Sequence, residues 1–261
     1  MNSIDFVIEN PLDGKLKEAN FITALLRDFP HSVFLKPTSY CHYNNCNYRK
    51  RTVFVTTLPS FNPHPPCPHN PCKRWVSGRP HKTSVLSLSK ADRNCIPNGL
   101  IDEEIDAWMS ATPEAKVRVF LDVFGGYGSV TKRVQQMYPE IFTYTNDIAR
   151  RDTNDVELDI RTFGLSGMVE FAAQKLLTQD DLQEARNDYK GGLLRWMKLE
   201  RGVAFLFHLS TPCETYSTAA GGTHRKSGDA TPVSAKAKNH DHMNSVIIKW
   251  LRRHALSSGA Q

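Results

Sequence analysis

Two side chains that can take part in covalent or acid–base chemistry each follow a short apolar run. Cys213 comes after AFLFHLS (residues 204–210), and Glu9 comes after IDFVI (residues 4–8). Such runs are typical of buried parallel strands, and open α/β sheets place their functional groups at the carboxyl ends of these strands. With an ordinary pKa only about 3% of a thiol is thiolate at pH 7, so a nucleophilic Cys213 needs a nearby arginine or helix N-terminus. The alternatives are an inert buried cysteine and a surface acid.

A glycine turn separates a predicted strand from a predicted helix in the middle of the chain. Residues 117–123 (VRVFLDV) predict the strand, and residues 130–137 predict the helix. Gly126 and Gly128 between them allow the backbone to approach a ligand closely, beside the first N–H groups of the helix. A dinucleotide fingerprint needs a third glycine three residues on, where this chain has Thr131, so S-adenosylmethionine is favoured over NAD or FAD. A plain tight turn is the alternative.

Acidic side chains also end the next two predicted strands. Residues 142–145 lead to Asp147, and residues 156–158 lead to Asp159. A carboxylate at the position of Asp147 can accept hydrogen bonds from both ribose hydroxyls of a nucleoside cofactor, and its alternative role is to cap a helix. Strands that alternate with helices and end in functional groups predict an α/β fold of the Rossmann-like kind.

Four segments resemble motifs of the cytosine-C5 DNA methyltransferases. PCETYS (212–217) resembles their PCQxFS motif, and DVFGGYGS (122–129) resembles their DLFAGxGG cofactor loop. LDI (158–160) resembles the GDI segment after their third strand, and IENP (8–11) resembles their ENV motif with proline in place of valine. The resemblance implies that Cys213 and Glu9 are catalytic. It also implies an S-adenosylmethionine site formed by Phe124, Gly126, Gly128, Asp147, Asp159, Ile160 and Pro212.

Two further segments match the same family less closely. YRKR (48–51) is similar to the end of the QxRxR motif but lacks a counterpart of the glutamine, and NCIP (94–97) is similar to GNxVP with Arg93 in place of the glycine. The resemblance implies that Arg51, with Arg49 as second choice, contacts the target base and that Asn94 helps to close the cofactor pocket. A solvated or phosphate-facing patch is the alternative for Arg49.

The motifs are those of the family in a rotated order. The usual chain begins with the cofactor loop and ends with ENV, QxRxR and GNxVP, whereas here the last three come first. We therefore expect a circularly permuted fold of S-adenosylmethionine-dependent methyltransferases with neighbouring chain ends. An amphipathic helix with an apolar stripe from Met243 to Leu251 should pack beside the strand at residues 4–8. The expected organisation is a catalytic subdomain (1–57), a small Pro/Cys-rich recognition lobe and linker (58–100), and a cofactor-binding subdomain with the catalytic cysteine (101–261).

The resemblance implies methylation of cytosine C5 in DNA through a covalent adduct. The Cys213 thiolate would attack C6, Glu9 would bind or protonate N3, Arg51 would bind the O2 edge, and C5 would accept the methyl group. The target base must leave the duplex first. Three alternatives stay open: an RNA cytosine methyltransferase, an inactive nucleic-acid-binding protein with this fold, and a methyltransferase with another kind of acceptor.

The segment at residues 221–239 is rich in Gly, Ser, Thr, Lys and Arg, which predicts a mobile basic loop just after Cys213. We expect this loop to close over the target, with phosphate contacts from Arg225, Lys226, Lys236 and Lys238. A surface loop without such a role is the alternative.

Four cysteines form two CxxxxC pairs, Cys41 with Cys46 and Cys67 with Cys72. His64, His69 and His81 lie nearby in the sequence, so a structural zinc site is one interpretation. Strong zinc motifs have tighter pairs, and the spacing therefore favours free thiols.

The composition bounds the partners and the setting. The net charge of +6, from 33 basic and 27 acidic residues, agrees with a polyanionic partner. No apolar run approaches the ~18 residues of a membrane span, and the first residues do not read as a secretory signal. We expect an intracellular monomer that binds DNA, with RNA as the alternative, and the sequence does not distinguish nucleus from cytoplasm.

Overall fold

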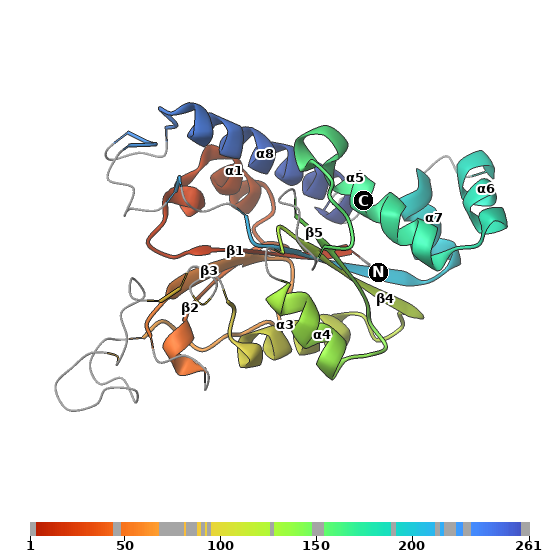
Figure 1. Ribbon diagram of the computed structural model, residues 1–261, viewed down its shortest axis with the longest axis horizontal. Coiled ribbons are helices and arrows are strands. Elements are labelled where there is room, and N and C mark those ends of the chain that lie inside the picture. Colours follow the sequence, from red (N-terminus) through yellow and green to blue (C-terminus); the bar gives the residue numbers. More distant parts are fainter. Residues whose placement is uncertain are drawn as a thin grey trace.

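The protein has an α/β fold built on one six-stranded mixed sheet (Figure 1). The computed structural model describes residues 4–43, 48–67, 81, 88–89, 92, 95–125, 128–147, 154–188, 192–211, 215–216, 223–226 and 231–256. The strands are β1 (Ile4–Pro11), β2 (Phe34–Ser39), β3 (Arg51–Thr56), β4 (Val117–Val123), β5 (Phe142–Asn146) and β6 (Val203–Leu209). Their order across the sheet is β2-β3-β1-β6-β4-β5.

The central strands are parallel and buried. β1 pairs with β6, and β4 pairs with both β6 and β5, all in parallel. Every residue of β6 is buried, as its apolar sequence VAFLFHL predicts for a strand covered on both faces. β3 is antiparallel to its two neighbours, β1 and β2. The prediction of an α/β fold is therefore confirmed, with a sheet that is parallel except around β3.

Helices cover both faces of this sheet (Figure 1). On one face lie α1 (Asn20–Asp28), α5 (Ile160–Leu176), α6 (Gln179–Asp188), α7 (Gly192–Glu200) and α8 (Ala235–Leu251), whose buried side chains join those of β1, β4 and β6 in one core. On the other face, α3 (Asn98–Ala111) and α4 (Ser129–Met137) form a second core with Val7, Phe54 and Phe120. Three shorter turns complete the described elements: η1 (Lys15–Glu18), η2 (Tyr40–His42) and the π-helical turn η5 (Arg252–Leu256).

The end of the described chain packs against its beginning. η5 follows α8 directly and contacts β1, and Ala255 and Leu256 share a core with Ile4. Of the apolar stripe predicted on α8, Ile247 and Leu251 are buried in this core, and Met243 and Trp250 are partly buried against it; Ile248, outside the predicted stripe, is buried as well.

Two expectations about local structure were wrong. The strand expected at residues 156–158 is a single bridge between Asn146 and Val156. The Asn146 side chain accepts from the Leu158 N–H, and the Asp155 carboxylate accepts from the Thr145 N–H of β5, so side chains take the place of ladder hydrogen bonds here. The loop expected at residues 221–239 is in part helical, since Ser234 caps α8 by accepting a hydrogen bond from the Ala237 N–H. None of the helices in the described ranges is both long enough and apolar enough to span a membrane.

Candidate active site

The carboxyl ends of three neighbouring strands meet at one edge of the sheet. Ile8 of β1 and Val123 of β4 both pair with Leu209 of β6. Glu9, Phe124 and the segment that leads from β6 to Cys213 therefore come next to one another. The chain also changes direction here, because β5 lies on one side of β4 and β6 on the other, and such a switch point is where open α/β sheets bind ligands. Pro212 and Cys213 themselves lie outside the described residues, as do Gly126 and Asn94.

The turn after β4 has the tight backbone that a ligand-binding loop needs. Phe124 adopts a left-handed conformation with φ 67°, which is rare for a bulky side chain, and its N–H donates to the Asn146 carbonyl at 2.8 Å. A side chain at Gly125 would place its Cβ 2.4 Å from the Thr145 side chain, so this position requires glycine. Gly128 precedes α4 with φ 65° and makes no side-chain cap. Gly125 was not among the predicted site residues, although its place in the GG pair was visible.

Polar side chains form a row across one face of this edge. Because side chains alternate along a strand, Glu9 and Val7 of β1 lie on the same face of the sheet. Val7 pairs with His208 of β6, and His208 pairs with Asp122 of β4, so these residues share that face. His208 is completely buried, and its Nδ1 lies 2.8 Å from Glu104 Oε1 of α3. This row of Glu9, His208 and Asp122 was not predicted from the sequence apart from Glu9.

The charges in this row perturb one another. Burial alone would lower the pKa of His208, but the charge and hydrogen bond of Glu104 and the charges of Asp122 and Glu9 raise it to about 9. Burial raises the pKa of Asp122, against the opposing effects of His208 and of the hydrogen bond from the Thr131 hydroxyl, 3.0 Å away. His208 is therefore a buried cation at neutral pH, directly behind the carboxyl edge.

Glu9 is held by two groups on the same face. Tyr40 donates its hydroxyl hydrogen to Glu9 Oε1 at 3.1 Å, and Lys50 Nζ lies 3.2 Å from the same oxygen. The Lys50 ammonium also lies 4.8 Å from the centre of the Tyr40 ring, which is a cation–π contact. Burial and the nearby Glu9 charge raise the pKa of Tyr40 well above its ordinary value, so Tyr40 stays a donor to Glu9. Glu9 is 7% exposed and fixed in place.

The two arginines predicted for this site are placed differently. Arg51 forms a surface ion pair with Asp13, with 2.8 Å between Nη1 and Oδ1. Arg51 begins β3, whose Phe54 pairs with Glu9, so the alternation of the strand directs Arg51 to the opposite face. Arg49 is half-buried just before β3. The cation that the structure brings to Glu9 is Lys50.

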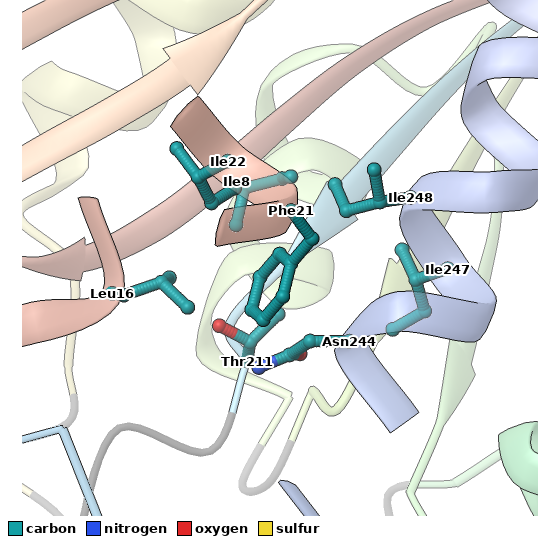
Figure 2. A pocket seen from close by; sticks show the side chains of 8 residues that line it. All are labelled: Ile8, Leu16, Phe21, Ile22, Thr211, Asn244, Ile247 and Ile248. Atoms are coloured by element: carbon teal, nitrogen blue, oxygen red, sulfur yellow. The ribbon is translucent and has the colours of Figure 1, made fainter. Parts of the chain in front are cut away.

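Residues on both sides of Cys213 are anchored. On the near side, Thr211 is buried and lines an apolar pocket between β1, α1 and α8 (Figure 2). The other residues that line it are Ile8, Leu16, Phe21, Ile22, Asn244, Ile247 and Ile248. Its volume of about 10 Å³ is at the lower limit for one water molecule, so it cannot hold a nucleobase or a nucleoside.

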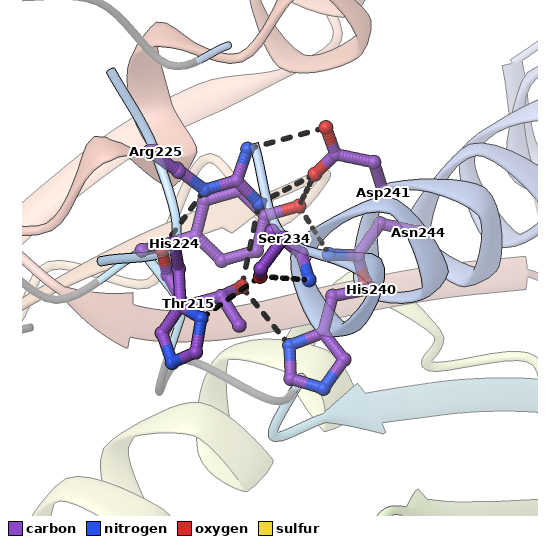
Figure 3. Close-up of polar contacts among 9 residues, drawn as sticks. Thr215, His224, Arg225, Ser234, His240, Asp241 and Asn244 are labelled. Atoms are coloured by element: carbon purple, nitrogen blue, oxygen red, sulfur yellow. Dashed lines mark hydrogen bonds and ion pairs between the residues drawn. The ribbon is translucent and has the colours of Figure 1, made fainter. Parts of the chain in front are cut away.

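On the far side of Cys213, Thr215 and Tyr216 are buried in a polar network with α8 (Figure 3). The Arg225 guanidinium stacks on the Tyr216 ring at 3.7 Å, donates to the Thr215 carbonyl at 2.9 Å and pairs with Asp241 at 2.6 Å. Tyr216 donates its hydroxyl hydrogen to the same Asp241 carboxylate. The expectation that Arg225 contacts phosphates is therefore wrong: its side chain is 3% exposed and holds Thr215 and Tyr216.

Several polar atoms at this edge have no partner among the described residues. They are the side-chain nitrogen and oxygen of Asn10 near the end of β1, the hydroxyl of Thr211 after β6, and Oδ1 of Asp122 near the end of β4. Buried polar atoms are nearly always hydrogen-bonded, so unsatisfied ones gathered in one place indicate where a ligand or water binds. This observation points to the same edge as the strand topology.

The two acidic residues predicted to bind the cofactor, Asp147 and Asp159, have different surroundings. Asp147 is half-buried at the end of β5, next to the glycine turn, and its carbonyl accepts a hydrogen bond from Asn154 at 2.9 Å. Asp159 instead caps α5 by accepting from the Arg161 N–H, and it pairs with the Arg161 guanidinium at 2.6 Å. Ile160 is buried in the core. Asp147 thus follows the strand that pairs with β4 at the glycine turn, whereas the Asp159 carboxylate is engaged by Arg161.

Comparisons of the chain with protein-family models, with curated proteins and with solved structures found no match. The class of protein is therefore defined only by the architecture of the fold and by the position of the candidate site. The protein is an α/β protein with an open, mostly parallel sheet and a candidate ligand site at the carboxyl edge of β1, β6 and β4.

Proposed function

We propose that the protein transfers a methyl group from S-adenosylmethionine to C5 of cytosine in DNA, through a transient bond between Cys213 and C6 of the base. The observation that carries the proposal is the meeting of three strand ends: Glu9, the segment leading to Cys213 and the glycine turn at Phe124 all lie at one edge. These are the segments that resemble the ENV, PC and cofactor-loop motifs. Their meeting at one edge of the sheet supports the proposal.

The residues around the end of β4 suit S-adenosylmethionine. Asp122 Oδ1 is a buried acceptor without a donor among the described residues, and the first N–H groups of α4 follow Gly128 without a side-chain cap. Asp147 stands at the end of the next strand, where a carboxylate can accept from ribose hydroxyls. When bound, the cofactor supplies an electrophilic methyl group.

Glu9 and Lys50 suit the pyrimidine edge of a flipped cytosine. A proton held between Glu9 and N3 withdraws electrons from the ring, which makes C6 more electrophilic toward the Cys213 thiolate. Lys50, which already lies beside Glu9, can donate to the O2 atom of the same base; we thus assign to Lys50 the role expected for Arg51. Tyr40 positions Glu9 from behind through its hydroxyl.

The proposed covalent steps need only the Cys213 thiolate as nucleophile and one proton acceptor. The Cys213 sulfur would bond to C6 and the electron pair of the 5,6 double bond would move to C5, which would accept the methyl group that S-adenosylmethionine supplies when bound, with a thioether as the leaving group. A base then removes the C5 proton, the double bond re-forms, and the C6–S bond breaks to return the thiolate.

The rotated motif order has support in the packing of η5 against β1. In the usual order the ENV strand follows the helix that here ends near Leu256, and a short connection would join the two. Strands of the expected segments 1–57 and 101–261 share one sheet, which also agrees with a single rotated domain.

A covalent trapping experiment tests the proposal. The protein is incubated with S-adenosylmethionine and a duplex that contains 5-fluorocytosine, which cannot lose a C5 proton and so blocks release. We expect an adduct stable to denaturing electrophoresis with wild type and with Cys95→Ser, which changes an exposed cysteine at the variable position of the GNxVP-like segment, but none with Cys213→Ala.

Other outcomes distinguish the alternatives. An adduct with 5-fluorocytosine RNA but not with DNA would assign an RNA substrate. Binding of DNA without an adduct or methyl transfer would indicate an inactive nucleic-acid-binding protein. Methyl transfer to an acceptor without a cytosine, undiminished in Cys213→Ala, would contradict the mechanism.

A further inference from the structure

A second cluster of reactive side chains lies where β2 ends. Cys41 and His42 belong to η2, directly after β2, and Cys67 comes from the segment after β3. The sulfur atoms of both cysteines and one ring nitrogen of His42 all lie within 4.8 Å of one another. Both cysteines are buried and contact each other.

The fold holds these groups in place. Ser39 is the last residue of β2, and its hydroxyl accepts a hydrogen bond from the Cys67 N–H at 2.9 Å. The His42 ring stacks on His64 with 5.7 Å between ring centres, and the His64 N–H donates to the Tyr43 hydroxyl at 3.2 Å. These contacts pin the segment after β3 to the η2 turn from two sides.

Two observations point to a bound ion rather than to apolar packing. His42 Nε2 is buried and has no hydrogen-bond partner among the described residues, although its neighbours in the cluster are two thiols. His81 Nε2 lies 3.7 Å from Cys67 Sγ. Metal–ligand distances of about 2.3 Å to sulfur and 2.0–2.1 Å to nitrogen place the sulfur and nitrogen atoms of a tetrahedral zinc site roughly 3.6 Å apart. The Cys67–His81 pair already has this separation.

We propose that Cys41, His42, Cys67 and His81 form a structural zinc site. Two thiolates and two imidazoles are a donor set that suits zinc, and four protein ligands close the coordination sphere without leaving a place for a substrate. The ligand atoms of Cys41, His42 and Cys67 lie within 4.8 Å of one another, so bringing these three to bonding distance of one ion needs shifts of about 1 Å; His81 adjoins them through its 3.7 Å contact with Cys67 Sγ.

This ligand set differs from the one that the sequence suggested. The two CxxxxC pairs would bring in Cys46 and Cys72, which lie outside the described residues. Among the described residues, the structure brings together one cysteine from each pair and adds His42, which the sequence had not suggested.

The zinc site would join the recognition segment to the candidate active site. η2 carries His42 at its end and Tyr40 at its start, and Tyr40 donates to Glu9. Zinc would therefore fix both the segment after β3 and the orientation of Tyr40.

The first test is the metal content of full-length protein purified without chelators. We expect about one zinc ion per chain in wild type and in Cys95→Ser, and a loss of at least tenfold in Cys67→Ser. Zinc retained in folded Cys67→Ser, or iron or copper in place of zinc, would refute the assignment.

The second test does not depend on the folding of a variant. Wild-type protein is stripped with a chelator and titrated with Co²⁺ alone, whose absorption reports thiolate ligands and tetrahedral geometry. We expect a thiolate-to-cobalt charge-transfer band, visible bands of tetrahedral intensity and a rise in melting temperature. If the purified protein contains no zinc and the titration gives no cobalt band, the cluster consists only of packed thiols and imidazoles and the proposal is wrong.

Discussion

The Lys50 ammonium lies 3.2 Å from the Glu9 carboxylate, whereas Arg51, its neighbour in the sequence, pairs with Asp13 on the opposite face of the sheet. The reason is the two-residue period of a strand. Phe54 of β3 pairs with Glu9, and counting back by twos from Phe54 reaches Lys50 and passes over Arg51. The motif resemblance had assigned the base-binding cation to Arg51, but the register of the strand favours Lys50.

This difference gives the first prediction. Lys50→Met should lower kcat/KM for methyl transfer by roughly 10- to 100-fold, because the target base would lose its O2 donor and Glu9 would lose the cation of a largely buried ion pair. Arg51→Met should change the rate less than about threefold, since exposed ion pairs contribute little. Initial rates on a cytosine-containing duplex measure both. A larger loss in Arg51→Met than in Lys50→Met would return the role to Arg51.

The second prediction concerns the buried cation His208. Its pKa is raised to about 9 from 6.5 by Glu104 and Asp122 in spite of its burial, so the folded state binds a proton that the unfolded state releases above pH 6.5. The resulting stability is fully present below pH 6.5 and is lost as the pH rises through about 9. At about 1.4 kcal/mol per pKa unit, a loss of order 3 kcal/mol is expected across this window.

Urea unfolding at a series of pH values measures this loss. The matched control is the double variant His208→Gln/Glu104→Gln, which keeps a hydrogen-bonding pair but carries no charge, and its stability should be nearly flat from pH 6.5 to 9. The same slope in wild type and double variant would show that His208 is neutral in the folded protein.

The third prediction tests the glycine turn. Gly125→Ala would bring its Cβ to 2.4 Å from Thr145 Cγ2 and 2.8 Å from Asp122 Oδ2, closer than such atoms approach. Overpacking of this kind typically costs 1–3 kcal/mol, so we expect a corresponding fall in the free energy of unfolding and weaker S-adenosylmethionine binding. Adding Thr145→Ser removes the nearer methyl group and keeps the hydroxyl that donates to Thr131, so it should restore part of the stability.

The control for this variant is Gly99→Ala. Gly99 lies in α3, and its added Cβ would meet only the Tyr43 ring, at 3.2 Å. Alanine is the better helix former, which offsets a small shift of the ring. Equal stability losses in Gly125→Ala and Gly99→Ala would mean that the crowding at the turn is not specific.

The strands of the sheet were largely predictable from the sequence, whereas helices such as α5 and α6 were not. β4 and β6 span the predicted residues 117–123 and 203–209, because long apolar runs flanked by polar or glycine residues are strong local signals. α5 carries a non-helical glycine, Gly164, inside its length, and α6 has a polar sequence, so neither shows a clean apolar stripe. α1, by contrast, has a clear stripe with Ile22 and Leu25 buried, and it could have been found.

The site was predictable only where a residue's role depends on its own strand. Glu9 follows an apolar run and does lie at the carboxyl edge. His208 and Glu104 are 104 positions apart in the sequence, so no local pattern indicates that the two side chains are in contact. His208 interrupts the apolar run of β6, however, and a titratable residue inside a buried strand is a signal for a buried partner.

The last prediction tests the rotated motif order through the contact between η5 and β1. Because η5 packs on β1, a Gly/Ser linker that joins the C-terminus to the N-terminus would bridge neighbouring elements. New ends can be placed between Pro113 and Glu114, two exposed residues in the connection from α3 to β4. The resulting chain would carry the motifs in the usual order of the family, and we expect it to fold with a melting temperature within a few degrees of wild type and to retain methyl transfer. A matched permutant opened inside β6, between Phe205 and Leu206, should not fold, since it divides the strand that pairs with both β1 and β4. If the first permutant also fails to fold while the linear protein is stable, the contact between η5 and β1 does not reflect a rotated domain, and the motif order has another origin.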